Sequence, residues 1–189
     1  MEQLQRTDDM KQEDSSGVKN RGCCNQHSCT KEELTQYRQD VRTRIAENDG
    51  TIFPNNCPDK TAIVLQEFIK AAKERVCIYC GHLNAAVYGD LQSDFEDAIA
   101  RDVKVRVICA PGEIGAKELA EKLSDGDHFR ILKEEVPVSH FAVVDGLRYR
   151  IETDQDSKEA FVCAYAGDEQ QPRVRIIEGV HGILWDLAS

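Results

Sequence analysis

The residues best suited to chemistry lie close together in one segment, residues 136–152, VPVSHFAVVDGLRYRIE. His140 can act as a base or nucleophile near neutral pH, since imidazole titrates in that range. Asp145, Arg150 and Glu152 follow it and could orient the ring or hold an anion. The simpler interpretation, which the sequence favours, is a hydrogen-bonded core histidine beside a solvated face that carries a cross-strand ion pair.

Two further polar residues follow an apolar run, in Gly81-His82-Leu83-Asn84. Ligands gather at the carboxyl ends of strands in α/β sheets, so His82 and Asn84 are candidate ligand-binding residues. Asn84 could equally cap the helix that follows. The preceding Cys77-Ile78-Tyr79-Cys80 has the spacing of a redox or metal motif. Residues i and i+3 of a strand point to opposite faces, so we expect two buried strand cysteines instead.

A cluster of potential metal ligands lies near the start of the chain: Cys23, Cys24, His27 and Cys29. Thiols and imidazoles are the usual ligands of zinc, so a zinc site is one interpretation. The spacing matches no standard zinc motif, and no second ligand pair follows at the usual distance. The other interpretation is a segment that happens to contain cysteines. We therefore expect no cofactor and keep zinc as the alternative.

The hydrophobic pattern predicts the elements that would position these residues. Asp145-Gly146 is typical of a two-residue type I′ turn, which makes 136–152 a β-hairpin. Thr30 and Glu33 form a capping box before a helix that ends near residue 48, and 51–59 is expected to be a linker. The remaining predicted elements are helices from Asp59 or Thr61 to about 72, 85–101, 113–124 and 173–187, and strands 76–79, 103–109, 129–132 and 160–166. Helices and strands alternate in the earlier part of this order, and strands joined by hairpins follow. This order predicts an α/β domain in which a mixed sheet is flanked by helices.

The charge balance is acidic: 34 Asp and Glu against 24 Lys and Arg give a net charge of −10 and a pI near 5.0. A broad nucleic-acid surface needs positive charge, so a nucleic-acid partner is disfavoured. The sequence has no apolar run of about 18 residues, and its first residues lack the apolar core of a signal peptide. We therefore expect a cytoplasmic protein without a membrane span.

Several segments resemble one half of the phospholipase D superfamily fold: LQEFIKAAKERVCIYCGHL, FEDAIARDVKVRVICAPG, HFAVVDG and GILWDL. The resemblance implies a single phospholipase D-like domain over 59–189, after a disordered or Cys-containing tail (1–29) and an N-terminal helix (30–50). Active members carry a His-x-Lys-x-x-x-x-Asp (HKD) motif, whose His attacks phosphorus and whose Lys binds the phosphate. Two copies form one site, in tandem or across a homodimer.

The chain departs from that motif. Alignment on Asp145 puts His140 at the Lys position and Val138, which cannot attack phosphorus, at the nucleophile position. The family's downstream Gly-Ser-x-Asn falls near residues 166–168, Ala-Gly-Asp, where Ser and Asn are missing. The resemblance therefore implies a degenerate HKD motif.

Two functions follow as hypotheses. The first is a catalytically inactive phospholipase D-like module that acts in binding, regulation or protein assembly, as a homodimer or with a partner protein. The alternative is a homodimeric phosphodiesterase or nuclease with a non-standard site built from His140, Asp145, Arg150 and Glu152.

Overall fold

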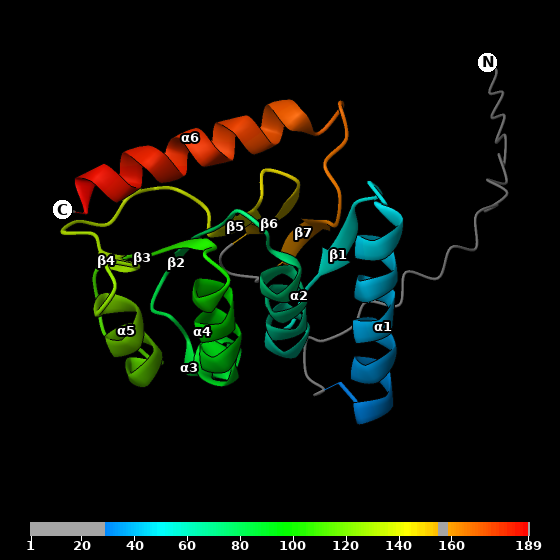
Figure 1. Cartoon of the computed structure of the whole chain (residues 1–189), viewed down its shortest axis with the longest axis horizontal. Helices are drawn as coiled ribbons and strands as arrows, with labels where there is room; N and C mark the ends of the chain where they lie inside the picture. Colours follow the sequence, from blue (N-terminus) through cyan, green and yellow to red (C-terminus); the bar gives the residue numbers. More distant parts are fainter. Residues whose placement is uncertain (1–28, 155–158, 189) are drawn as a thin grey trace, which may run out of the picture.

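The computed structural model describes residues 29–154 and 159–188 (Figure 1). Within them, seven strands form one sheet in the order β1-β7-β6-β5-β2-β3-β4. The strands are β1 (Phe53–Asn55), β2 (Arg75–Cys80), β3 (Lys104–Cys109), β4 (Phe129–Ile131), β5 (Phe141–Val144), β6 (Arg148–Asp154) and β7 (Glu159–Cys163). β2, β3 and β4 run parallel, whereas the pairs from β2 through β5, β6 and β7 to β1 are antiparallel. The predicted α/β class with a mixed sheet is confirmed.

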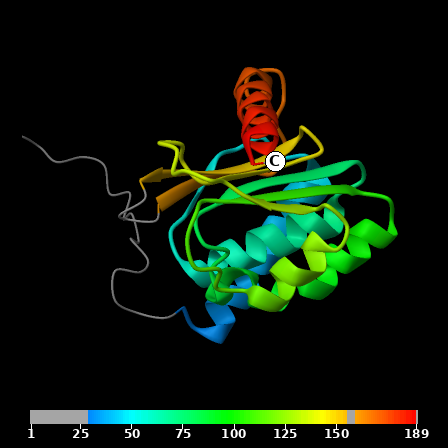
Figure 2. The same cartoon turned by 90° about the vertical axis from the view of Figure 1, so that its left-hand side faces the viewer.

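Helices cover both faces of this sheet (Figures 1 and 2). One face carries α1 (Lys31–Glu47), α2 (Pro58–Ala71), α3 (Ala85–Tyr88), α4 (Gln92–Ala100) and α5 (Lys117–Ser124), with the short 3-10 helix η1 (Gly89–Leu91) between α3 and α4. The long helix α6 (Gln171–Leu187) crosses the opposite face alone. The sheet therefore separates two apolar clusters. Phe68 of α2 and Phe95 of α4 belong to the first, and Tyr149 of β6 and Trp185 of α6 belong to the second.

The predicted hairpin turn is confirmed at Asp145-Gly146. Both residues have positive φ, 56° and 66°, which Asp tolerates and Gly adopts freely. The Leu147 N–H donates to the Val144 carbonyl at 3.0 Å and closes the turn. β5 begins only at Phe141, so the strand is shorter than the predicted one.

The predicted capping box is present at the start of α1. The side chains of Thr30 and Glu33 each accept a hydrogen bond from the other residue's backbone N–H. The expected linker is instead the edge strand β1, and Pro54 is exposed there, where its missing N–H costs no ladder bond. α2 begins at Pro58 with Cys57 as its N-cap, ahead of the caps predicted at Asp59 or Thr61. A proline suits the first helical position because its φ is already fixed near the helical value.

Two other predicted helices are shorter in the structure. The predicted helix 85–101 is divided into α3, η1 and α4, and Gly89, a weak helix former, lies at the division. α5 begins at Lys117, four residues later than expected. None of the helices in the described part of the chain is long and apolar enough to cross a membrane.

Candidate functional site

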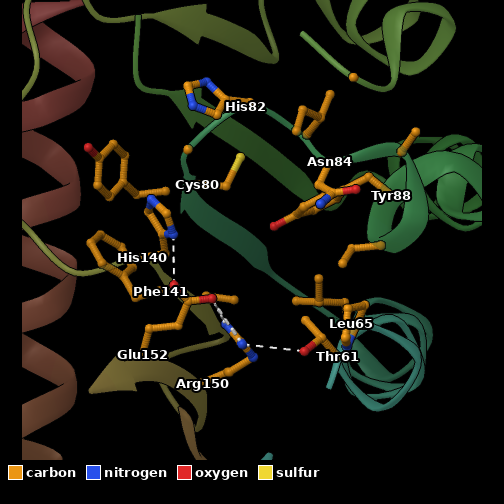
Figure 3. Close-up of a pocket in the computed structure, with 18 of the residues that line it drawn as sticks. Thr61, Leu65, Cys80, His82, Asn84, Tyr88, His140, Phe141, Arg150 and Glu152 are labelled. Carbon is orange, nitrogen blue, oxygen red and sulfur yellow. Dashed lines mark hydrogen bonds and ion pairs between the residues drawn. The ribbon is translucent and has the colours of Figure 1, made fainter. Parts of the chain in front are cut away.

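A pocket of about 640 Å³ opens where the carboxyl end of β2 meets the start of β5 and the helices α2 and α3 (Figure 3). Its polar end is formed by His140, Arg150 and Glu152, while Leu65 and Tyr88 contribute to its apolar wall. The carboxyl end of a strand is the usual place for a ligand site in α/β sheets. The volume lies within the usual range of small-molecule sites.

His140 is oriented by Glu152. Its Nδ1 lies 2.8 Å from Glu152 Oε2, and its ring packs edge-on against Tyr79 with centroids 5.7 Å apart. A carboxylate only accepts, so Nδ1 carries the proton and donates it. The ring's other nitrogen, Nε2, lies beside Gly81, where an added Cβ would approach it to 3.1 Å. Nε2 is therefore left with its lone pair available at the pocket.

Arg150 is buried behind this pair, 6% exposed. Its Nε donates to Asn55 Oδ1 at 2.9 Å, and Nη1 and Nη2 both donate to Glu152 Oε1 at 3.1 Å. Nη2 also lies 3.3 Å from Thr61 Oγ1. The expectation of a solvated face was wrong for this strand, because Asn55 of β1 and Thr61 of α2 supply buried polar partners for the guanidinium. Figure 3 shows the contact of Arg150 with Thr61.

Glu152 links His140 and Arg150. Burial raises the pKa of its carboxyl group, but the hydrogen bond from His140 and the positive charge of Arg150 outweigh burial and hold that pKa below its ordinary value. Glu152 is therefore ionised at neutral pH and balances the charge of Arg150. The three side chains form one continuous network, which we call the His140–Glu152–Arg150 network.

His82 and Asn84 both lie at this pocket, as the strand-end argument predicted. His82 is exposed at the rim (Figure 3). Asn84 caps α3, since its Oδ1 accepts from the Ala86 N–H at 2.9 Å. His82, His140 and Arg150 therefore share one pocket.

Asp145 lies elsewhere, at the far end of β5 from His140. Its carboxylate accepts the backbone N–H groups of Lys73, Glu74 and Arg75 at 2.8 to 3.2 Å. It also pairs with the buried Arg148 at 3.4 Å. The structure does not bring Asp145 together with His140, Arg150 and Glu152, because both its oxygens fix the turn to the start of β2.

Two further parts of the family comparison, Val138 and residues 166–168, do not line the pocket either. Val138 is half-buried and packs against the apolar cluster under α6. Residues 166–168 lie in the loop between β7 and α6.

The cysteines of the CxxC motif point to opposite faces, as expected. Cys80 Sγ lies 3.3 Å from Cys109 Sγ on the neighbouring strand β3, whereas Cys77 lies within reach of the charge of Glu178 on α6. Of the candidate zinc ligands, only Cys29 is within the described residues, and Cys23, Cys24 and His27 lie outside them. No group of three metal-ligating side chains occurs among residues 29–154 and 159–188.

Sequence reasoning missed Asn55 and Thr61, the partners of Arg150. Asn55 is fully buried and its Oδ1 lies 2.7 Å from Thr61 Oγ1. Asn55 lies within, and Thr61 just after, the segment 51–59 that was expected to be a linker. A polar residue inside a short edge strand gives no periodic signal, so only the fold reveals their role.

The sequence matches no protein-family model and no curated protein. Solved structures do share its fold. Nuc from Salmonella typhimurium, a phospholipase D family member, superposes with a TM-score of 0.57 at 11% identity, over 74% of this chain and 96% of Nuc. TrmBL2, described as an archaeal chromatin protein with a novel mode of DNA binding, gives a TM-score of 0.53 at 11% identity. That match covers 84% of this chain but only 62% of TrmBL2. At this identity the likeness shows a phospholipase D-like fold and no more.

Proposed function

We propose that this chain is a catalytically inactive phospholipase D-like module that binds a small molecule in the pocket between β2, β5 and α2. The observation that carries the proposal is the commitment of Arg150. Every nitrogen of its guanidinium already donates to Glu152, Asn55 or Thr61. The group therefore holds the pocket together and is not available as an anion clamp.

The charge of the pocket supports the same conclusion. Among the described residues that line it, Arg150 is the only Lys or Arg, and Glu152 neutralises it. Glu113 adds a further carboxylate at the exposed rim. A phosphodiester in its transition state needs fixed positive charge on its oxygens. This pocket favours a neutral or cationic ligand over a phosphate.

The residues at the positions of the HKD motif also support an inactive module. The residue aligned with the family's nucleophile, Val138, is apolar, packs against the apolar cluster under α6 and is not among the residues that line the pocket. The aligned lysine position holds His140, which donates to Glu152. The chemistry implied by the family resemblance thus has neither its nucleophile nor its phosphate-binding amine. Association as a homodimer or with a partner protein stays a prediction.

One observation favours the phosphodiesterase alternative. A histidine whose Nδ1 is held by a carboxylate has the orientation of a general base or nucleophile. His140 has this orientation, and its Nε2 is available at the pocket. This second candidate requires turnover that depends on His140.

Ligand binding can be tested with a matched pair of variants on α3. Ala85 lines the pocket and is exposed, whereas its exposed neighbour Ala86 is not among the lining residues. Ala85→Phe should obstruct the pocket, and Ala86→Phe should add the same ring outside it. We would screen neutral, cationic and phosphorylated small molecules by thermal shift with the full chain and both variants.

A ligand at 100 times its Kd stabilises the folded state by about 2.7 kcal/mol, which raises Tm by several degrees. The proposal predicts that a neutral or cationic compound produces this shift in the wild type and in Ala86→Phe, and that the shift disappears in Ala85→Phe. A shift given only by phosphodiesters and lost in Ala85→Phe would support the alternative instead.

A further inference from the structure

The outer side of α6 carries the three most exposed large apolar side chains among the described residues. Ile176 is 67% exposed, Ile183 63% and Leu187 60%. Together with Gly179 they recur every three or four positions, so they lie along the side of the helix that faces away from the sheet. Figure 2 shows no other described helix or strand above this side. We call these four residues the outer stripe.

The fold of a single chain does not explain the outer stripe. Apolar side chains gathered on an exposed face mark a contact surface. A Cβ added at Gly179 would meet no heavy atom within 4 Å, so packing within the chain does not require a glycine there. Glycine is also a weak helix former. A glycine in the middle of the stripe does allow a second helix to approach closely, because the separation of packed helices depends on the side chains at their contact.

We propose that a second copy of this chain docks on the outer stripe, with the two α6 helices packed antiparallel. A two-fold axis at the level of residue 181 brings Ile183 opposite Gly179 of the second copy, and Ile176 opposite its Leu187. Both pairs have their midpoint within one residue of position 181, so one axis satisfies both. The stripe is therefore complementary to itself, as a two-fold interface requires.

The charges beside the outer stripe fit the same axis. Arg175 and Asp186 are exposed and lie 11 residues apart, about three helical turns, so they are on the same edge of the stripe. The antiparallel arrangement brings Arg175 of each copy to Asp186 of the other, which gives two ion pairs at the rim. A parallel arrangement would put both copies of Arg175 at one level and both copies of Asp186 at another. Charge complementarity therefore selects the antiparallel pair.

A groove beside the start of α6 extends this surface. It has a volume of about 500 Å³, and its lining includes Ile52, Ile151, Pro172 and Ile176. Ile176 belongs both to the groove and to the outer stripe. Because Leu187 of the second copy lies opposite Ile176, the end of the second helix reaches the mouth of the groove. The surface thus continues from the helix towards the exposed Ile52 and exceeds a contact of two helices alone.

The proposal does not depend on ligand binding in the pocket. No residue of α6 is among the described residues that line the pocket, so a dimer through α6 leaves the pocket open in both copies. The family resemblance implies a different homodimer, in which two copies form one site. An α6 dimer shares no site, and its failure would leave the proposed ligand binding untouched.

Sedimentation velocity of the full chain tests the proposal. We expect an equilibrium between the 21.3 kDa chain and a species of twice that mass over roughly 1–100 µM, the range in which small interfaces dissociate. Ile183→Glu should weaken the association by at least about 30-fold, as expected at the centre of an interface. Ile131→Glu is the matched control, because Ile131 is an exposed isoleucine on β4, away from the stripe. It should dimerise like the wild type.

Two further sets of variants test the register. Gly179→Gln should raise the Tm of the monomer, since glutamine is the better helix former, and yet weaken the dimer by blocking close approach. Arg175→Asp and Asp186→Arg should each weaken the dimer roughly tenfold, because each sets like charges together twice. The double variant should restore the wild-type affinity, which the parallel arrangement does not predict. These substitutions are at exposed positions, and circular dichroism confirms that each variant is folded.

Four results would overturn the proposal. The first is a wild-type chain that stays monomeric at the highest concentration. The second is an Ile183→Glu variant that dimerises as tightly as Ile131→Glu, and the third is a folded double variant that dimerises no better than Arg175→Asp or Asp186→Arg. The fourth is a monomeric chain that binds vesicles of anionic lipid and loses this binding in Ile183→Glu, which would assign the stripe to a membrane surface.

Discussion

His140 and Glu152 are joined twice across the hairpin. The Glu152 N–H donates to the His140 carbonyl at 2.9 Å, and His140 Nδ1 lies 2.8 Å from Glu152 Oε2. The same register pairs Phe141 with Ile151 in the ladder that follows. A slip of one residue would move one side chain to the other face of the sheet, so the strand register itself specifies this pair.

The first prediction concerns Glu152→Gln. The variant keeps the shape of the side chain but leaves buried Arg150 without its counterion, which should cost about 3 kcal/mol of the free energy of unfolding at pH 7. The folded-state pKa of Glu152 lies below its ordinary value of 4.5. Its stabilising contribution is therefore complete above that ordinary value and is lost as the pH falls through the folded pKa.

Urea unfolding of both proteins between pH 7 and pH 3 measures this effect. The difference in stability should shrink as the pH falls below the ordinary value of 4.5 and through the folded-state pKa, where wild-type Glu152 also becomes protonated. Glu113→Gln, at the exposed rim, should differ from the wild type by less than about 0.5 kcal/mol at every pH. A difference for Glu152→Gln that stays constant over the whole range would contradict the assigned ionisation.

The second prediction concerns Asp145, which the structure places in the turn. Asp145→Ala removes the acceptor for three backbone N–H groups and the partner of Arg148, so it should cost about 3–5 kcal/mol. Arg148 is 8% exposed and burial lowers its pKa, so the charge is costly once its partner is gone.

A double-mutant cycle checks the pairing of Asp145 with Arg148. Arg148→Met should destabilise the wild type but cost less in the Asp145→Ala background, because it then removes an unpaired buried charge. Thermal shifts by a pocket ligand should be retained in any folded Asp145 variant. Additive effects of the two substitutions, or loss of ligand binding in a folded Asp145 variant, would place Asp145 in a different role.

The third prediction concerns His181 on α6. Burial, with a smaller contribution from the charge of Arg106, lowers the pKa of His181 from 6.5 to about 4, while a hydrogen bond to the Arg106 carbonyl opposes the shift. The unfolded chain therefore binds more protons than the folded one between about pH 4 and 6.5, and the folded state loses up to about 3 kcal/mol as the pH falls through that window.

Chemical denaturation at several pH values would test this effect of His181. His181→Leu should make the free energy of unfolding flatter between pH 6.5 and pH 4, whereas the exposed His82→Gln should keep the wild-type slope. An unchanged slope in His181→Leu would show that other groups cause the acid sensitivity.

Local sequence features predicted much of the fold. The Thr30 capping box and the Asp145-Gly146 turn depend on neighbours a few residues away, and both are in the structure. Strand periodicity likewise separated Cys77 from Cys80 correctly. The order of alternating elements then led to the mixed α/β sheet.

The site was less predictable because its contacts are long-range. Arg150 meets Asn55 and Thr61, which precede it by 95 and 89 residues. A strand that looks half solvated in the sequence becomes buried once β1, β7 and α2 cover it. No sequence pattern within one segment predicts that β1, β7 and α2 will bury this strand.

The most direct test of the central claim is phosphodiester hydrolysis by the purified full chain beside His140→Ala. Single-stranded DNA and a chromogenic phosphodiester would be supplied in separate assays, each with and without added zinc. We predict no turnover above the no-protein background in either protein, because the described lining of the pocket has no available cation for the phosphate and Val138 stands at the position aligned with the family's nucleophile. Turnover by the wild type that disappears in His140→Ala would contradict it and would make His140 a catalytic residue.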